Sequence, residues 1–127
     1  MFRNNFIHNL GATGTTTPVI EANVNSDPMT FENNAHWDPT AAGGGLYVDE
    51  ASMNLTTAAM INALPGAASN VVVDCMLNAT FHLTAGSMCI DAGTNTTCPA
   101  ADFEAQSRPF SATAPAFCDI GADELHP

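Results

Sequence analysis

Lysine is absent from this sequence, and only Arg3 and Arg108 oppose thirteen acidic residues, which leaves a net charge of −11. Nucleic acids and anionic membrane surfaces attract clusters of Lys and Arg, so neither is an expected partner. Charged residues of both signs make up only 12% of the chain, about half of the usual ~25%. The acidic excess either keeps the protein soluble or supplies carboxylates for a cation.

Long apolar runs are also missing. No stretch approaches the ~20 apolar residues that a membrane-spanning helix needs, so membrane insertion is not expected. The residues after Met1 do not form the apolar core of a signal peptide. If the protein is secreted, we therefore expect this chain to be a piece of a longer one whose export signal lies elsewhere.

The four cysteines all lie in the second half of the chain. An even number in a small, weakly charged chain favours disulfides and an oxidising compartment, hence a secreted or cell-surface protein. Their spacing is not that of a zinc site. We predict a bridge between Cys98 and Cys118, which closes a loop of about 20 residues and contributes ~3 kcal/mol in the chain-entropy model. Cys75 and Cys89 form either a second bridge or two buried thiols.

A short apolar segment that closes on two asparagines occurs twice. Asn4–Asn5 and Asn33–Asn34 are 29 residues apart, an interval that fits one coil of a β-solenoid with a loop insertion. Because so few residues are charged, the polar surface consists mainly of Asn, Thr, Ser and Gly. This composition is typical of short strands and tight turns.

One helix is expected in an otherwise β-rich chain. Asn54 provides an N-cap for an Ala- and Met-rich helix over residues 55–64. Residues 36–45 predict a loop, and residues 71–73 and 80–83 predict short strands.

Three ordered blocks in the second half carry a family resemblance. They are NATFHLTAGSMCIDAGT at 78–94, DFEAQSRP at 102–109 and CDIGADE at 118–124. These blocks resemble the C-terminal region of bacterial right-handed parallel β-helix proteins of the pectate-lyase-like superfamily. In particular, they are similar to the choice-of-anchor Q group of predicted surface proteins. The resemblance covers roughly residues 30–124, and residues 88–89 depart from it, with Met-Cys in place of the usual Pro-Ala.

The resemblance implies an all-β fold, made of the last coils of a right-handed parallel β-helix, a C-terminal cap and one short flanking α-helix. It divides a single domain into coils over 1–50, a helix and final strands over 51–86, and a loop-rich cap over 87–127. A solenoid exposes an apolar end after its last coil, and the cap is expected to cover it. The implied cap residues are Asp91, Gly93, Asp102, Arg108, Asp119 and Gly121.

Polar cap residues are expected to fix turns rather than to react. We expect Asp91 and Asp119 to accept hydrogen bonds from neighbouring backbone amides. We expect Arg108 to pair with Asp102, Asp119 or Glu124, because it is one of only two arginines in an acidic chain.

No catalytic residue is predicted. The β-helix lyases, as the superfamily implies, use acidic calcium ligands with an Arg or Lys base, and here Arg3 lies at the start of the chain and Arg108 in the cap motif. The adjacent pairs Asp49–Glu50 and Asp123–Glu124 do not suit a glycosidase, because neighbours on a strand point to opposite faces. No cofactor is expected. If calcium binds, the candidate ligands are Asp119, Asp123 and Glu124.

The expected function is a non-catalytic C-terminal module of a secreted or cell-surface β-helix protein, adhesin-like or scaffold-like. One alternative is the end of a polysaccharide lyase or glycoside hydrolase whose active site lies upstream. Another is a carbohydrate-binding module in which Trp37 and Tyr47 stack on a sugar. The expected partners are a polysaccharide or other cell-surface ligand, and a second copy through the exposed first coil at residues 2–10.

Overall fold

The structure is a computed structural model that describes residues 1–8, 19–39, 46–111 and 115–126. The described residues form eight short strands and one helix: β1 (Phe2–Arg3), β2 (Phe6–His8), β3 (Phe31–Glu32), β4 (Ala35–Trp37), β5 (Tyr47–Asp49), β6 (Met53–Leu55), α1 (Ala58–Ile61), β7 (Ala67–Ala68) and β8 (Val71–Val72). The regular structure is therefore mostly β with one short helix, as the sequence predicted.

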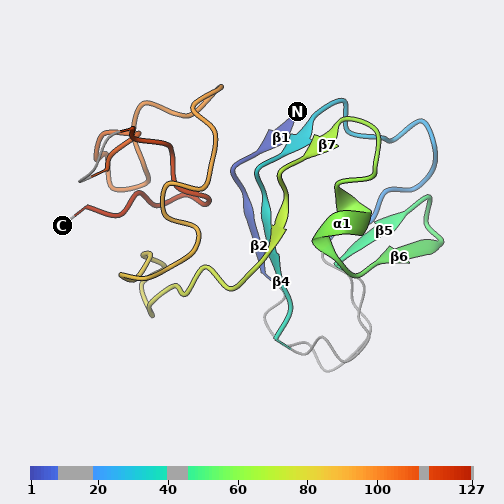
Figure 1. Cartoon of the computed structure of the whole chain (residues 1–127), viewed down its shortest axis with the longest axis horizontal. Helices are drawn as coiled ribbons and strands as arrows, with labels where there is room; N and C mark the ends of the chain where they lie inside the picture. The colour runs from blue at the N-terminus through green and yellow to red at the C-terminus, as the bar shows by residue number, and fades with distance from the viewer. Residues whose placement is uncertain (9–18, 40–45, 112–114, 127) are drawn as a thin grey trace.

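Six of the strands form two parallel three-stranded sheets, with the orders β1–β3–β7 and β2–β4–β8. Phe2 pairs with Phe31 in the first sheet, and Phe6 pairs with Ala35 in the second. The third pass of the chain adds β7 and β8 in the same way. Each of three successive passes thus contributes one strand to each sheet, and the passes stack in register (Figure 1).

A bend with a left-handed backbone separates the two strands of each pass. The bend residues are Asn4, Asn33 and Ser69, with φ values of 54°, 53° and 57°. Asn tolerates this conformation better than most residues, because its short polar side chain forms local hydrogen bonds. The two Asn-Asn pairs of the sequence are therefore equivalent bends, and Ser69–Asn70 is a third bend that the repeat analysis did not include.

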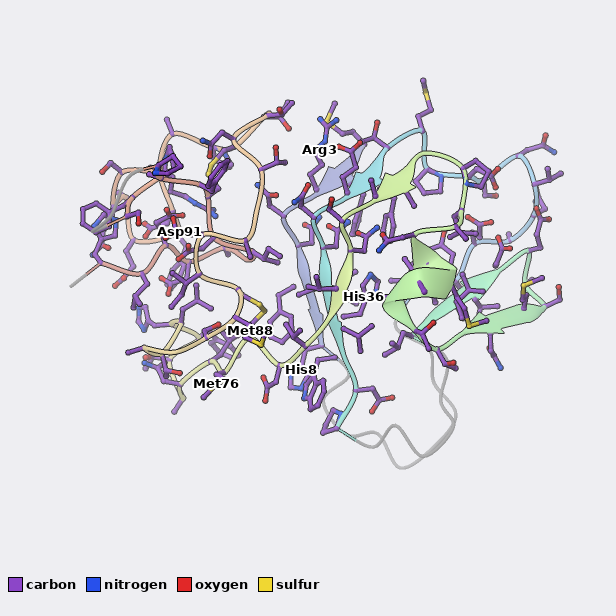
Figure 2. All side chains as sticks on the ribbon, in the orientation of Figure 1. Arg3, His8, His36, Met76, Met88 and Asp91 are labelled. Carbon is purple, nitrogen blue, oxygen red and sulfur yellow. A yellow bond between two sulfur atoms is a disulfide. The ribbon has the colours of Figure 1, made fainter. Side chains whose placement is uncertain are left out.

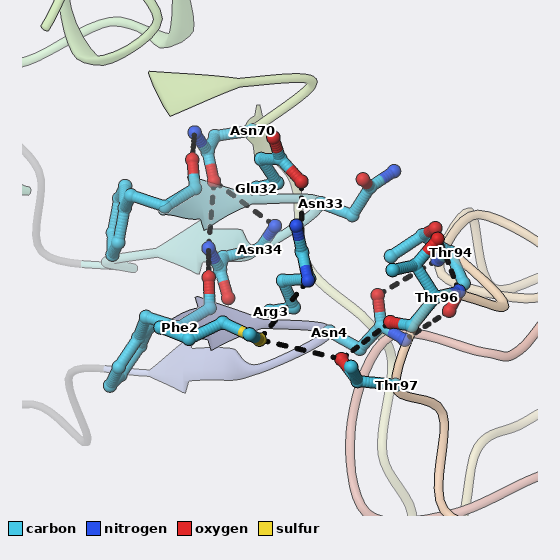
Figure 3. A network of polar contacts seen from close by, with 12 residues as sticks. Phe2, Arg3, Asn4, Glu32, Asn33, Asn34, Asn70, Thr94, Thr96 and Thr97 are labelled. Atoms are coloured by element: carbon cyan, nitrogen blue, oxygen red, sulfur yellow. Dashed lines mark hydrogen bonds and ion pairs between the residues drawn. The ribbon is translucent and has the colours of Figure 1, made fainter. Parts of the chain in front are cut away.

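The second residue of each bend is an asparagine (Asn5, Asn34 and Asn70), and these side chains form a hydrogen-bonded ladder across the passes, of which Figure 3 shows Asn34 and Asn70. Asn5 Nδ2 donates to Asn34 Oδ1 at 2.9 Å, and Asn34 Nδ2 donates to Asn70 Oδ1 at 2.8 Å. Asn62, just after α1, closes the ladder by exchanging hydrogen bonds with Asn70. The ladder satisfies buried polar groups that would otherwise oppose folding.

Two apolar cores lie on opposite faces of the β2–β4–β8 sheet, because adjacent residues on a strand point to opposite sides. The inner core contains the buried residues Phe31, Leu46, Tyr47, Leu55 and Ile61. The outer core contains the buried residues Ala35, Cys75, Leu83, Cys89 and Ile120. Ile7 and Val72 pack on the inner core, whereas Phe6 and Val71 pack on the outer core. The sheet is thus covered on both faces.

His36 lies in β4 between Ile7 and Val72 and is fully buried. Its ring packs 5.6 Å from that of Phe31, and neither of its nitrogens has a well-formed hydrogen bond to another described residue. Burial lowers the pKa of His36 to about 4, and the backbone of Leu46 opposes this effect only in part. The imidazole is therefore neutral at pH 7.

The helix differs from its prediction. Residues Met53–Leu55 form β6, which pairs antiparallel with β5 through Tyr47 and Leu55. The helix α1 has only four residues, and Thr57, not Asn54, is its N-cap, with Thr57 Oγ1 accepting from the Met60 amide at 3.2 Å. The pairing of β6 with β5 places Leu55, the first residue of the expected helix, and its expected N-cap Asn54 in a strand. The predicted loop at 36–45 was also wrong at its start, since β4 runs to Trp37; residues 40–45 lie outside the described residues.

The chain after β8 covers the outer core. In residues 74–126, the described part has no named strand and only the isolated bridges Leu77–Leu83 and Ala101–Ser107, so the strand expected at 80–83 is absent. Figures 1 and 2 show this C-terminal segment on one side of the sheets, with Met88 and Asp91, and α1 and His36 on the other. It packs along the side of the stack, whereas the sequence led us to expect a cover over one end.

Candidate functional site

A half-open hollow of about 720 Å³ lies between the first bend and the C-terminal segment. Its wall includes Phe6 from β2 and Phe81, Phe103, Arg108 and Asp123 from the C-terminal segment. Phe81 is 67% exposed and Phe103 is 53% exposed. The hollow therefore combines accessible aromatic rings with a few polar groups, which is typical of a small-ligand site.

His82 stands beside the hollow in a fixed position. Asn78 Oδ1 accepts from the amides of Thr80 and His82 at 2.9 and 3.0 Å and holds the turn. The His82 ring stacks on Phe103 with centroids 5.2 Å apart, and its Nδ1 lies 2.8 Å from Thr80 Oγ1. His82 is only partly exposed, because the turn directs the ring onto Phe103.

The first of two candidate metal clusters contains His82, Glu104 and Asp123, which offer ligand atoms within 4.8 Å of one another. His82 Nε2 lies 3.1 Å from Glu104 Oε2, and Asp123 Oδ2 accepts from the Leu83 amide at 2.6 Å. Each carboxylate of this cluster therefore has a partner within the chain, Glu104 in His82 and Asp123 in the Leu83 amide.

Arg108 forms a buried ion pair at the base of the C-terminal segment. Its Nε donates to Glu124 Oε2 at 2.9 Å, and its Nη2 donates to the Asp119 carbonyl at 2.8 Å. Glu124 also accepts from the amides of Phe110 at 2.5 Å and Asp119 at 3.0 Å. The predicted pairing of Arg108 with one of three acids is confirmed, with Glu124 as the partner.

Asp119 and Asp91 accept backbone hydrogen bonds, as predicted. Asp119 Oδ1 accepts from the Asp91 amide at 2.6 Å and Oδ2 from the Leu125 amide at 2.8 Å. Asp91 Oδ1 accepts from the Phe117 amide at 3.1 Å. Burial raises the pKa of Asp119 to about 6, the two amides oppose this effect, and the charges of Glu124 and Asp91 add to it.

The three predicted calcium ligands do not form a metal cluster in the described part of the chain. Asp119, Asp123 and Glu124 use their oxygens to accept hydrogen bonds from amides or from Arg108. Only Asp123 belongs to one of the two candidate clusters. The calcium site predicted from proximity in the sequence was wrong, because each carboxylate points to a different part of the backbone.

The predicted cap glycines fix the contact between the C-terminal segment and the first bend. A Cβ on Gly93 would lie 2.5 Å from the Cys118 carbonyl oxygen and 2.9 Å from Asn4 Oδ1. Beside it, Asn4 Nδ2 donates to the Thr94 carbonyl at 2.7 Å and Asn4 Oδ1 accepts from the Thr94 amide at 2.8 Å. Gly121, with a φ of 124°, donates its amide to the Asn4 carbonyl at 2.9 Å.

Asp102 has a local role. Its Oδ1 accepts from the amides of Glu104 and Gln106 at 2.9 and 2.8 Å. It thereby holds the turn that carries Phe103 beside the hollow.

Both disulfides that the sequence suggested are present. Cys98 is joined to Cys118 and Cys75 to Cys89, with Cα–Cα distances of 6.4 and 5.3 Å, and no cysteine is free. The Cys75–Cys89 bridge lies in the outer core. Two disulfides are compatible with an extracellular protein.

The two residues predicted to stack on a sugar differ in their exposure to solvent. Tyr47 is 1% exposed, and its ring packs edge-on against Phe31 at 5.4 Å. It therefore has no free face for a sugar, which corrects its prediction. Trp37 ends β4 and is partly exposed. The accessible aromatic residues beside the hollow are instead Phe81 and Phe103.

The second candidate metal cluster was missed from the sequence. Glu21, Asp49 and Glu50 offer carboxylate oxygens within 4.8 Å of one another. Glu50 and Ala51 form the β5–β6 turn with φ values of 53° and 55°, so Glu50 does not follow the alternation of a strand. Glu21 joins the pair because Ile20 bridges to Val48 of β5. No local sequence pattern predicts a contact between residues that lie this far apart in the sequence.

Comparisons of this chain with known protein families, with curated proteins and with solved structures found no match. In the part of the chain that the structure describes, no helix has the length and hydrophobicity needed to cross a membrane.

Proposed function

We propose that this chain is a non-catalytic module of an extracellular right-handed parallel β-helix protein, with a scaffolding role. The observation that carries the proposal is the stack of three in-register passes with an asparagine ladder at their shared bend. Buried asparagine ladders satisfy the polar groups of a coil only when coils repeat, so they suit a solenoid.

The secreted assignment rests on the disulfides. Structural disulfides persist in oxidising compartments and are rare in the reducing cytosol. Cys98–Cys118 and Cys75–Cys89 both lie in the strand-poor C-terminal segment, where they restrain backbone that no strand ladder holds. The lack of lysine and the net charge of −11 also favour partners other than nucleic acid.

A structural role is favoured over a lyase because both arginines are engaged. Arg3 Nε donates to Glu32 Oε2 at 2.8 Å, and Arg108 is buried with Glu124. A base must reach its substrate unpaired, and neither guanidinium meets that condition in the described part of the chain.

The proposal makes two testable statements. Interstrand nuclear Overhauser contacts should connect Phe31 with both Phe2 and Ala67; an antiparallel pattern would defeat the β-helix. A screen of the purified chain on acidic and neutral polysaccharides should yield neither unsaturated products nor new reducing ends. Either product would overturn the scaffolding role in favour of a lyase or a glycoside hydrolase.

Carbohydrate binding is the second candidate function, because Phe81 and Phe103 expose rings beside the hollow. Aromatic faces stack on sugars, and the polar groups of the wall can orient hydroxyls. On an array of polysaccharides, Phe81→Ala and Phe103→Ala should reduce binding, whereas Met29→Ala, at a 93% exposed site elsewhere, should not. Equal binding by all three variants would remove this candidate.

Self-association also stays a prediction. β1 and β2 each lie at an edge of their sheet, and Phe2 is 41% exposed; residues 9 and 10 of the predicted surface lie outside the described residues. An edge strand offers free backbone groups to a further strand. Light scattering across a concentration series should reveal a dimer that Phe2→Asp weakens.

A further inference from the structure

The acidic cluster of Glu21, Asp49 and Glu50 brings three carboxylates together without an evident counter-charge. One ligand oxygen of each residue lies within 4.8 Å of the other two. Glu21 is 7% exposed. Its Oε2 accepts from the Tyr47 hydroxyl at 2.6 Å, but its Oε1 is buried and has no hydrogen-bond partner among the described residues. A buried, half-satisfied carboxylate is unfavourable unless something else binds it.

No basic side chain in the described part of the chain pairs with this cluster. Arg3 pairs with Glu32 and Arg108 with Glu124, and the chain has no lysine. His82, the only histidine in an ion pair there, faces Glu104. The basic groups that form ion pairs in the described residues are therefore all engaged with other carboxylates.

We propose that the acidic cluster binds a calcium ion, which holds the segment around Glu21 against the β5–β6 hairpin. The donors are oxygens alone, which suits a hard cation and disfavours zinc or copper. Calcium accepts irregular geometry and carboxylates in one- or two-oxygen contact, whereas magnesium demands a near-ideal octahedron and sheds water reluctantly. Water completes the coordination at Glu50, which is exposed.

The ion has a mechanical consequence. The Glu21 amide donates to the Val48 carbonyl at 3.0 Å, and the Ala51 amide donates to the Glu21 carbonyl at 2.8 Å. These bonds already place the Glu21 segment beside the hairpin, so the carboxylates converge before the ion binds. Calcium relieves the repulsion between the carboxylates and links the Glu21 segment to the β5–β6 hairpin. Removal of calcium loosens the contact between these two segments.

The test uses the full chain, stripped of metal with a chelator, and calcium chloride as the probe. Calorimetric titration should show one site with a dissociation constant in the ~10⁻⁴–10⁻³ M range of extracellular calcium sites. The melting temperature should rise with calcium and saturate, and magnesium at equal concentration should have a smaller effect. No heat and no shift up to about 10 mM calcium would overturn the proposal.

Three variants locate the ion. Asp49→Asn and Glu50→Gln, both at the hairpin turn, should each weaken calcium binding about tenfold or more without unfolding the chain, since every 1.4 kcal/mol is a factor of ten. Glu104→Gln removes an equal charge from the His82 cluster and should leave calcium binding unchanged. Loss of binding in Glu104→Gln alone would place the ion at His82 and overturn the assignment, and an equal response of all variants would indicate screening by salt only.

Terbium provides an independent readout. Tyr47 is the only tyrosine of the chain, and its hydroxyl contacts Glu21, so an ion in the acidic cluster lies close enough to be sensitised by it. Terbium emission on tyrosine excitation should fall when calcium displaces the probe. Tyr47→Phe should lose the emission while calorimetry still detects calcium; retained emission would contradict the site.

Discussion

Replacement of Asn34 by leucine tests the asparagine ladder at its centre. Leucine has nearly the same branched shape as asparagine, but it forms no hydrogen bonds. Asn34 is fully buried, and its side chain accepts from the Asn5 amide and Asn5 Nδ2 and donates to the Phe2 carbonyl and Asn70 Oδ1, at 3.1, 2.9, 3.2 and 2.8 Å. All four bonds are lost in Asn34→Leu.

The magnitude follows from what each partner retains. Asn5 Nδ2 still donates to the Arg3 carbonyl, and Asn70 Oδ1 still accepts from the Asn34 amide. Among the described residues, the Asn5 amide keeps no other acceptor. An orphaned buried group costs about 1–3 kcal/mol and each exchanged bond about 1 kcal/mol. We expect a total loss of about 3–6 kcal/mol, a large fraction of the ~5–15 kcal/mol of a typical domain.

Urea denaturation followed by circular dichroism measures this loss as a lower transition midpoint. Asn5→Leu, at the end of the ladder, should cost about half as much, because only two of its side-chain bonds disappear. Asn23→Ala, an exposed control with one local bond to the Asn25 amide, should cost under about 1 kcal/mol. A stability of Asn34→Leu within about 1 kcal/mol of the parent would refute the role assigned to the ladder.

Three further predictions concern other parts of the molecule. Gly93→Ala should lower the unfolding free energy by about 2–4 kcal/mol in thermal melts, because its Cβ would meet the Cys118 carbonyl oxygen at 2.5 Å. Relative to His36→Val, the parent should lose up to about 3 kcal/mol of stability as pH falls from 6.5 towards 4, because the folded pKa of His36 is about 4. The comparison with the variant is needed because the raised pKa of Asp119 has the opposite effect in the same range and removes stability from both proteins as pH rises through about 6. Cys98→Ser should cost about 3 kcal/mol; intact mass should show no free thiol in the parent before reduction, and alkylation without reductant would contradict both bridges.

The repeat was readable from the sequence because one residue type serves two purposes at the bend. Asn suits the left-handed position at Asn4 and Asn33, and Asn also builds the ladder at the next position. The third bend escaped because Ser69 occupies the left-handed position there, which leaves no Asn-Asn pair. The interval also grows from 29 to 36 residues, since this pass carries the hairpin and α1.

Local helix propensity gave a wrong prediction where pairing between strands determines the structure. Residues 55–64 are rich in helix formers, yet Leu55 pairs with Tyr47 in a hairpin and only Ala58–Ile61 become helical. The acidic cluster could not be predicted from the sequence for the same reason, because Glu21 comes close to Asp49 only through the parallel bridge of Ile20 to Val48. The cysteine pairing could be predicted from the sequence because an even number of cysteines with short separations leaves few alternatives.

The acidity of the C-terminal segment has a structural cause beyond solubility. Residues 74–126 form almost no strand pairs in their described part, so their amides need other acceptors. Six of the seven acids of this segment accept from backbone amides: Asp74, Asp91, Asp102, Asp119, Asp123 and Glu124. The seventh, Glu104, faces His82. Carboxylates thus do here what a ladder of strands does in the first half, and a lysine-free sequence leaves them available because few cations compete for their oxygens.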